Sequence, residues 1–108
     1  ARAKEIIIDR VEYYAQGYGF NPKQVRIKHL TSRWGSCSTL GNLNFSWTLM
    51  CFDLDVIDYV VVHELCHLKQ MNHSKKFWSL VEAIVPDYNR HRVFLKQNQF
   101  QVPTLCTP

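Results

Sequence analysis

The segment between Asp53 and Asn72 constrains the fold more than any other part of the chain. Asp53 is a natural N-cap and Asn72 a natural stop, and together they predict a helix over about 54–71. Apolar residues surround much of its circumference, which is typical of a helix packed on several sides. We therefore expect this helix at the centre of the fold, with the following residues in its core contacts: Val56, Ile57, Val60, Val61, Val62, Leu65 and Leu68.

Three further helices are predicted around it. Residues 3–16 carry apolar side chains at helical spacing, and Gly17 follows as a stop. Ser74 is the next N-cap, and the amphipathic helix that it starts ends at Pro86, because proline cannot continue a helix. A last helix is expected over roughly 87–99. The central helix therefore has helical neighbours both before and after it in the sequence.

Two segments alternate apolar and polar residues, as half-buried strands do. These segments are Val25–Leu30 and Leu43–Trp47. Leu40–Asn42, just before the second, predicts the tip of a hairpin whose other arm holds Trp34–Ser38. A small, mainly antiparallel sheet combined with several helices predicts an α+β fold.

Length and composition predict a single domain. The chain has 108 residues, 46% of them apolar, which is enough for one compact core. No repeat or linker interrupts it, so we expect residues 1–108 to form one unit with an extended tail at about 101–108. The net charge of +4 is scattered along the sequence, and we do not expect nucleic acid as a partner. No apolar run is long enough to span a membrane.

The four cysteines lie far apart in the sequence. They form no C-x-x-C pair, which argues against a cysteine-rich zinc site and against a dense disulfide framework. We therefore expect reduced thiols in a cytoplasmic protein, and a small buried thiol at Cys66. The other three cysteines are Cys37, Cys51 and Cys106.

The predicted central helix carries the pattern H-E-x-x-H at His63, Glu64 and His67. Two histidines four residues apart lie one turn apart on the same face, so both imidazoles can reach one cation. Glu64 projects beside the metal, where it can take a proton from a metal-bound water, as this motif does in metalloproteases. Unpaired polar groups on so apolar a helix would be costly, which favours a metal site over chance.

A catalytic zinc site needs a third protein ligand and keeps an open position for water. His73 lies six residues beyond His67. In a continuous helix those six residues would turn through roughly 600° and place His73 on the wrong side, so the helix must break between the two. Glu82 on the following helix is the rival ligand, and we favour His73.

Four segments of the chain carry specific motifs. These are R-W-G-S-C-S at 33–38, G-N-x-x-x-x-W at 41–47, V-V-H-E-L-x-H-L at 61–68 and N-H-S-x-x-F-W at 72–78. As a set they resemble the minimal gluzincin-like peptidases (minigluzincins) and the related YgjP-like metallopeptidase domains. The resemblance covers roughly residues 25–95. It implies zinc as the metal, His73 as the third ligand, and a minimal, thermolysin-like zincin half-domain.

The resemblance also implies how a substrate lies in the cleft. An extended peptide would add as a strand to the sheet edge near Leu43–Trp47, with its carbonyl facing the zinc. The group that stabilises the oxyanion stays open at this point. Its candidates follow Pro86 and are Tyr88, Asn89, His91 and Arg92.

The sequence thus predicts a zinc-dependent endopeptidase that acts on a peptide or protein, with Glu64 as its general base. Two alternatives are a SprT-like protease acting on DNA-bound proteins and a non-enzymatic zinc-binding fold. Glu64 argues against the second, because a structural site needs no base. Members of the resembling family use C-terminal segments for latency. We therefore expect residues 101–108 to inhibit the cleft of their own chain, or to cause self-association into a homo-oligomer by entering a neighbour's.

Overall fold

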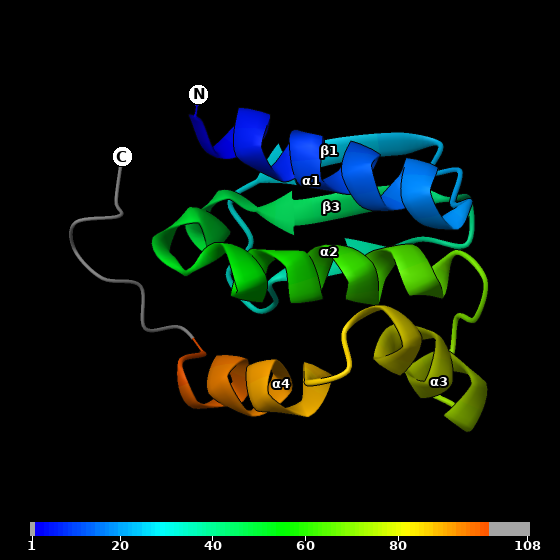
Figure 1. Ribbon diagram of the computed structural model, residues 1–108. Helices are drawn as coiled ribbons and strands as arrows, with labels where there is room; N and C mark the ends of the chain where they lie inside the picture. The colour runs from blue at the N-terminus through cyan, green and yellow to red at the C-terminus, as the bar shows by residue number, and fades with distance from the viewer. Residues whose placement is uncertain (1, 100–108) are drawn as a thin grey trace.

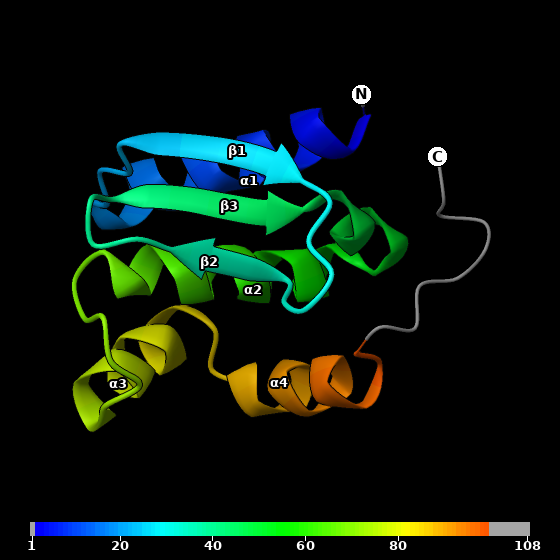
Figure 2. The same cartoon turned by 180° about the vertical axis from the view of Figure 1, so that it is seen from behind.

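The structure is a computed structural model in which residues 2–99 are described, with side chains from Lys4 onward. Helices and one small sheet form two layers, so the predicted α+β class is confirmed. Figure 1 shows the long helices lying in front of the sheet, and Figure 2 shows the sheet from behind. The elements in chain order are α1 (Arg2–Tyr18), β1 (Gln24–Lys28), β2 (Gly35–Cys37), β3 (Asn42–Ser46), the 3-10 helix η1 (Trp47–Cys51), α2 (Leu54–His67), α3 (Lys75–Ile84) and α4 (Tyr88–Gln97).

The sheet has the strand order β1-β3-β2, so β3 is its central strand. The hairpin between β2 and β3 is antiparallel, as predicted, and pairs Gly35 with Phe45 and Cys37 with Leu43. The longer pairing between β1 and β3 is parallel, which makes the sheet mixed rather than mainly antiparallel. Alternation along a strand specifies which side chains face the core but not the direction of the neighbouring strand, so the sequence did not contain this detail.

Helix α2 lies at the centre of the molecule, as predicted. Apart from Leu54 at its start, its apolar residues are buried, and Val61, Val62 and Leu65 have no exposed surface. It ends at His67, four residues earlier than expected, and Asn72 is not its stop. The backbone tightens there into a turn in which the Leu68 and Lys69 amides donate to carbonyls three residues back. This early ending provides the break that His73 requires.

Helix α1 is fastened to α2 by an ion pair in addition to apolar contacts. The Arg10 guanidinium donates to both carboxylate oxygens of Asp58 at 2.7 and 2.8 Å, and the Tyr14 hydroxyl donates to the same carboxylate at 3.0 Å. Ile7 and Val11 on the same face of α1 are buried. The sequence predicted this helix two residues too short at its C-terminal end, because α1 continues through Gly17 to Tyr18.

The strand predicted over Leu43–Trp47 stops one residue early, because Trp47 begins η1. The hydroxyl of Ser46 caps η1 by accepting from the Thr48 amide, and the two hydroxyls lie 2.7 Å apart. Cys51 at the end of η1 is disulfide-bonded. The expectation of reduced thiols is therefore wrong for this residue, since wide spacing of cysteines in a sequence does not exclude a disulfide. No helix in the described part of the chain is long and apolar enough to cross a bilayer.

Candidate active site

Three imidazoles meet at the C-terminal end of α2. The Nε2 atom of His73 lies 3.2 Å from Nε2 of His67 and 3.3 Å from Nε2 of His63. Tetrahedral ligands at a Zn–N distance of 2.0–2.1 Å are separated from each other by about 3.3 Å. Two of the three separations match this value, and all three ligand atoms lie within 4.8 Å of one another, so the group can hold one zinc ion. In the part of the chain that is described, no other set of three metal-binding side chains converges in this way.

The backbone around His73 explains how a residue beyond the helix reaches the other two imidazoles. His63 and His67 share one face of α2 because they are one turn apart. After the turn at Leu68, the chain returns along the helix end, and Ser74 starts α3 by accepting a hydrogen bond from the Phe77 amide. His73 is thus held between the end of one helix and the cap of the next, as the sequence predicted.

The other ring nitrogen of two of these histidines has a partner within the protein. Nδ1 of His67 lies 3.0 Å from the Gln70 carbonyl, so Nδ1 must carry the proton and Nε2 is left with its lone pair. Nδ1 of His63 lies 3.2 Å from the Tyr59 hydroxyl oxygen. In the tautomer that leaves Nε2 of His63 free for a metal, Nδ1 carries the proton and donates it to this oxygen. Such partners orient an imidazole and raise its basicity as a ligand. Sequence analysis missed Tyr59, although it lies one helical turn before His63.

Aromatic rings enclose the three imidazoles. The fully buried ring of Phe77 stacks on His67 with a centroid distance of 4.3 Å and meets His63 edge-on at 4.9 Å. Trp78 stacks on His73 at 5.8 Å. Burial and the neighbouring imidazoles lower the pKa of His63 to about 3, and burial lowers the pKa of His67. Both rings are therefore neutral near pH 7, which is the form that binds a metal.

Glu64 lies beside the histidines and lines a cavity of about 290 Å³ together with His63. Only 6% of its surface is exposed. Burial raises its pKa to about 8, while the charge of Arg33 acts in the opposite direction. A carboxyl group with a pKa near neutrality can both accept and return a proton, which suits a general base that later acts as an acid.

Gly35 in β2 is the residue that lets Glu64 fit. A Cβ atom at this position would lie 3.0 Å from Cγ of Glu64 and 3.2 Å from the backbone oxygen of Asn44. The sequence predicted that Gly35 lies in one arm of a hairpin. The structure places it within a strand, where the absence of a side chain allows the strand to approach α2 closely.

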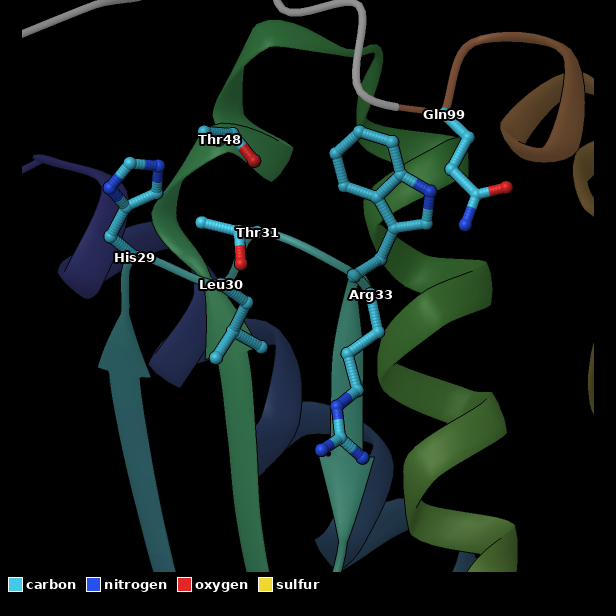
Figure 3. A pocket seen from close by; sticks show the side chains of 7 residues that line it. His29, Leu30, Thr31, Arg33, Thr48 and Gln99 are labelled. Atoms are coloured by element: carbon cyan, nitrogen blue, oxygen red, sulfur yellow. The ribbon is translucent and has the colours of Figure 1, made fainter.

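The cavity continues along the open edge of β2. Towards the start of the strand it adjoins a hollow of about 170 Å³, around which Figure 3 shows His29, Thr31, Thr48 and Gln99. Towards the end of the strand it adjoins a hollow of about 190 Å³. Sequence analysis placed the substrate edge near Leu43–Trp47. That assignment is wrong, because β3 is paired on both sides and the free edge beside the histidines belongs to β2.

The other residues considered at this site lie in different places. Glu82 is exposed on α3 and is not part of the histidine cluster. Arg92 lines the cavity with His63 and Glu64, whereas Tyr88 and Asn89 do not line it. His91 is buried and stacks on Tyr59 with a centroid distance of 6.0 Å.

Comparison with known proteins identifies the chain. Residues 1–98 match the family model of the YgjP-like metallopeptidase domain. The chain belongs to this family. The sequence-based resemblance is therefore confirmed, and this YgjP-like protein is a zinc metallopeptidase, a hydrolase. No curated protein gives a significant match.

Two solved structures share the fold of the YgjP-like protein. One is the metallopeptidase zymogen of Pyrococcus abyssi abylysin, with a TM-score of 0.74 and 24% identity over 86% of this chain and 95% of that chain. The other is the metallopeptidase zymogen of Methanocaldococcus jannaschii jannalysin, with a TM-score of 0.74 and 22% identity over 85% of this chain and 95% of that chain. Both confirm the minimal zincin half-domain as the fold.

Proposed function

We propose that this protein is an endopeptidase in which His63, His67 and His73 hold the zinc ion and Glu64 is the general base. The observation that carries the proposal is the convergence of three imidazole nitrogens, which lie close enough together to bind one zinc ion. Glu64 borders the same cavity as His63 and is absent from the cluster itself. This arrangement supplies three protein ligands and leaves a position open, which is typical of catalytic rather than structural zinc.

His63, His67 and His73 would hold the zinc ion, which would serve as a Lewis acid for the scissile carbonyl and for a water molecule. Glu64, which lines the cavity beside His63, takes the proton of the attacking water. The same carboxyl group then delivers the proton to the leaving amine nitrogen. Of the four oxyanion candidates beyond Pro86, Arg92 on α4 is the one that lines the cavity, where it can donate hydrogen bonds to the substrate.

The free edge of β2 is the proposed binding site for the peptide backbone. Strand addition uses the unpaired amide and carbonyl groups of an edge strand, and residues Gly35–Cys37 provide such an edge. Gly35 and Glu64 line the cavity together, so a peptide on this edge runs past the general base. An extended protein or peptide segment is therefore the proposed substrate.

Metal content tests the ligand assignment. We expect one zinc per wild-type chain, and we expect His73→Ala to lose at least 90% of the metal at a fixed buffered zinc concentration. Glu82→Ala is the matched control, because it removes the rival ligand from an exposed position. Elemental analysis of both purified variants decides between them. Zinc loss in Glu82→Ala with full retention in His73→Ala would reverse the assignment.

We further propose that residues 101–108 regulate this site. They lie outside the described residues. The proposal is supported by the open groove along β2 and by the two similar structures, which are zymogens. A tethered segment meets such a groove at an effective concentration that reaches millimolar, so weak contacts suffice for inhibition. The same segment would drive self-association if it entered the groove of a neighbouring chain.

Removal of residues 101–108 tests this regulation. We expect specific activity to rise in the shortened protein, and we expect the wild type to lose specific activity as its concentration is raised. Peptide hydrolysis would be measured across a hundredfold dilution series for both proteins. Equal specific activity at every concentration would exclude inhibition by this segment.

A further inference from the structure

The cavity beside Glu64 has cationic walls. Arg33 lies on one wall, just before β2, and Arg92 and Lys96 lie on the opposite wall, on α4. Among the described residues, Glu64 is the single acidic one that lines this cavity or either adjoining hollow. A bound zinc ion would add two positive charges to the same space. The cleft therefore combines at least three protein cations with one carboxylate.

In the described part of the chain, these cations differ from Arg10 and Arg90 in forming no ion pair with an acidic residue. Arg10 pairs with Asp58 at 2.7 Å, and Arg90 pairs with Asp87 at 2.7 Å. Within residues 4–99, no ion pair involves the three cleft cations. Arg33 interacts electrostatically with Glu64, whereas the charges of Arg92 and Lys96 have no ion-pair partner among the described residues and are available to a ligand.

One of the three is also held in place. The Nε–H of Arg92 donates to the Asn89 side-chain oxygen at 3.2 Å, and the guanidinium carbon lies 5.9 Å from the centroid of the Trp78 ring. Lys96 follows one helical turn later on α4 and lines the same cavity. An orienting contact of this kind reduces the entropy that a side chain loses when it binds an anion.

Two of the three cations, Arg92 and Lys96, lie on one side of Glu64. In the hollow towards the end of β2, the residues other than Arg33, Glu64 and Gly35 are neutral when unprotonated: Ser36, Cys37, His67 and Met71. The side bounded by α4 instead contains Arg92 and Lys96. A peptide that crosses the cleft would thus meet a cationic surface on one side of its scissile bond and a largely uncharged surface on the other.

We propose that the α4 side of the cleft is a carboxylate-binding subsite that selects acidic peptides. The ligand chemistry is a carboxylate, carried by a glutamate or aspartate side chain or by the C-terminus of the substrate. This proposal rests on the endopeptidase function proposed above. Unpaired cations in a cleft increase the affinity of the protein for an anionic ligand and the rate at which the ligand reaches the cleft.

Matched peptides provide the test. One parent peptide would be acetylated and amidated so that its ends are uncharged, and a single Gln would be placed in turn at each position. Each Gln would then be exchanged for Glu, which changes the charge and preserves the shape. A third series keeps Gln and leaves the C-terminus as a free acid. Hydrolysis by the zinc-loaded wild type gives kcat/KM, and fluorescence anisotropy gives the affinity for the zinc-loaded Glu64→Gln protein.

We expect Glu to raise kcat/KM and affinity on the order of tenfold on one side of the scissile bond, with a steep loss of this gain at high salt. A gain confined to the free-acid series would assign the subsite to a chain end. Lys96→Gln should remove most of the gain, whereas Lys76→Gln, an exposed lysine on α3, should preserve it. Lys76→Gln carries the same change of net charge.

Two failures are distinguishable in this experiment. Equal affinity and equal kcat/KM for the neutral, Glu and free-acid peptides would overturn the carboxylate subsite and leave the peptidase function intact. Absence of hydrolysis with a retained preference for acidic peptides in the binding assay would overturn the peptidase function and support the subsite. An equal effect of Lys76→Gln and Lys96→Gln would also overturn the subsite, because general charge attraction would then explain the preference.

Discussion

Replacement of Gly35 by alanine tests how closely β2 and α2 must approach for catalysis. The added Cβ would lie 3.0 Å from Cγ of Glu64, whereas carbon atoms in ordinary contact lie about 3.5–4.0 Å apart. The opposite neighbour, the carbonyl of Asn44, lies at 3.2 Å and belongs to the central strand, which is paired on both sides. Glu64 therefore has to move, by about 0.5 Å on these distances.

Displacement of a catalytic group by about 1 Å lowers the rate roughly a hundredfold. A shift of Glu64 by about half that distance should therefore lower kcat/KM on the order of tenfold. Overpacking should also lower the free energy of unfolding by about 1–3 kcal/mol. Zinc content should stay at the wild-type level, because the three atoms nearest to the new methyl group belong to Glu64 and Asn44 and not to a proposed ligand.

Peptide hydrolysis, zinc analysis and urea unfolding would be measured on Gly35→Ala and on Gly17→Ala. At Gly17, in α1, a Cβ atom meets nothing within 4 Å, so this control should keep full activity and gain about 0.5–1 kcal/mol of stability from helix propensity. Unchanged kcat/KM in Gly35→Ala would refute the argument that this glycine sets the position of Glu64.

Two further substitutions test the supports of the site. Tyr59→Phe removes the partner of His63 Nδ1 and should weaken zinc affinity by about 10–100-fold in a chelator competition assay; unchanged affinity would mean that this contact does not orient the ligand. Asp58→Asn breaks the link between α1 and α2 and should lower the free energy of unfolding by about 1–3 kcal/mol in urea. The control Asp55→Asn, at the exposed start of α2, should lower the free energy of unfolding by less than about 1 kcal/mol. Equal losses of stability in the two variants would contradict the role of Asp58 in linking α1 to α2.

The sequence contained enough information for the centre of the fold and for the metal cluster. H-E-x-x-H on an apolar helix places His63 and Glu64 at a shared site, and the required break after His67 is a consequence of helix geometry alone. The cap at Ser74 was also readable, because serine before an amphipathic run is a local signal. These features depend on residues that are close in sequence.

The features that the sequence did not reveal depend on contacts between distant segments. The parallel pairing of β1 with β3 and the exposed edge of β2 are decided by how the chain crosses the sheet. The role of Gly35 depends on its approach to Glu64, twenty-nine residues later in the sequence. Tyr59 is the exception, since a hydroxyl one turn before His63 is a local signal that could have been recognised.

Substitution of the proposed base tests the central claim most directly. Glu64→Gln preserves the shape of the side chain and removes its ability to accept a proton. The account predicts a variant that keeps one zinc per chain and the wild-type fold, yet loses at least about a hundredfold in kcat/KM for peptide hydrolysis. The decisive measurement is kcat/KM of wild type and Glu64→Gln at matched, verified zinc content. Equal hydrolysis by the two proteins would contradict the assignment of Glu64 as the general base and, with it, the proposed mechanism.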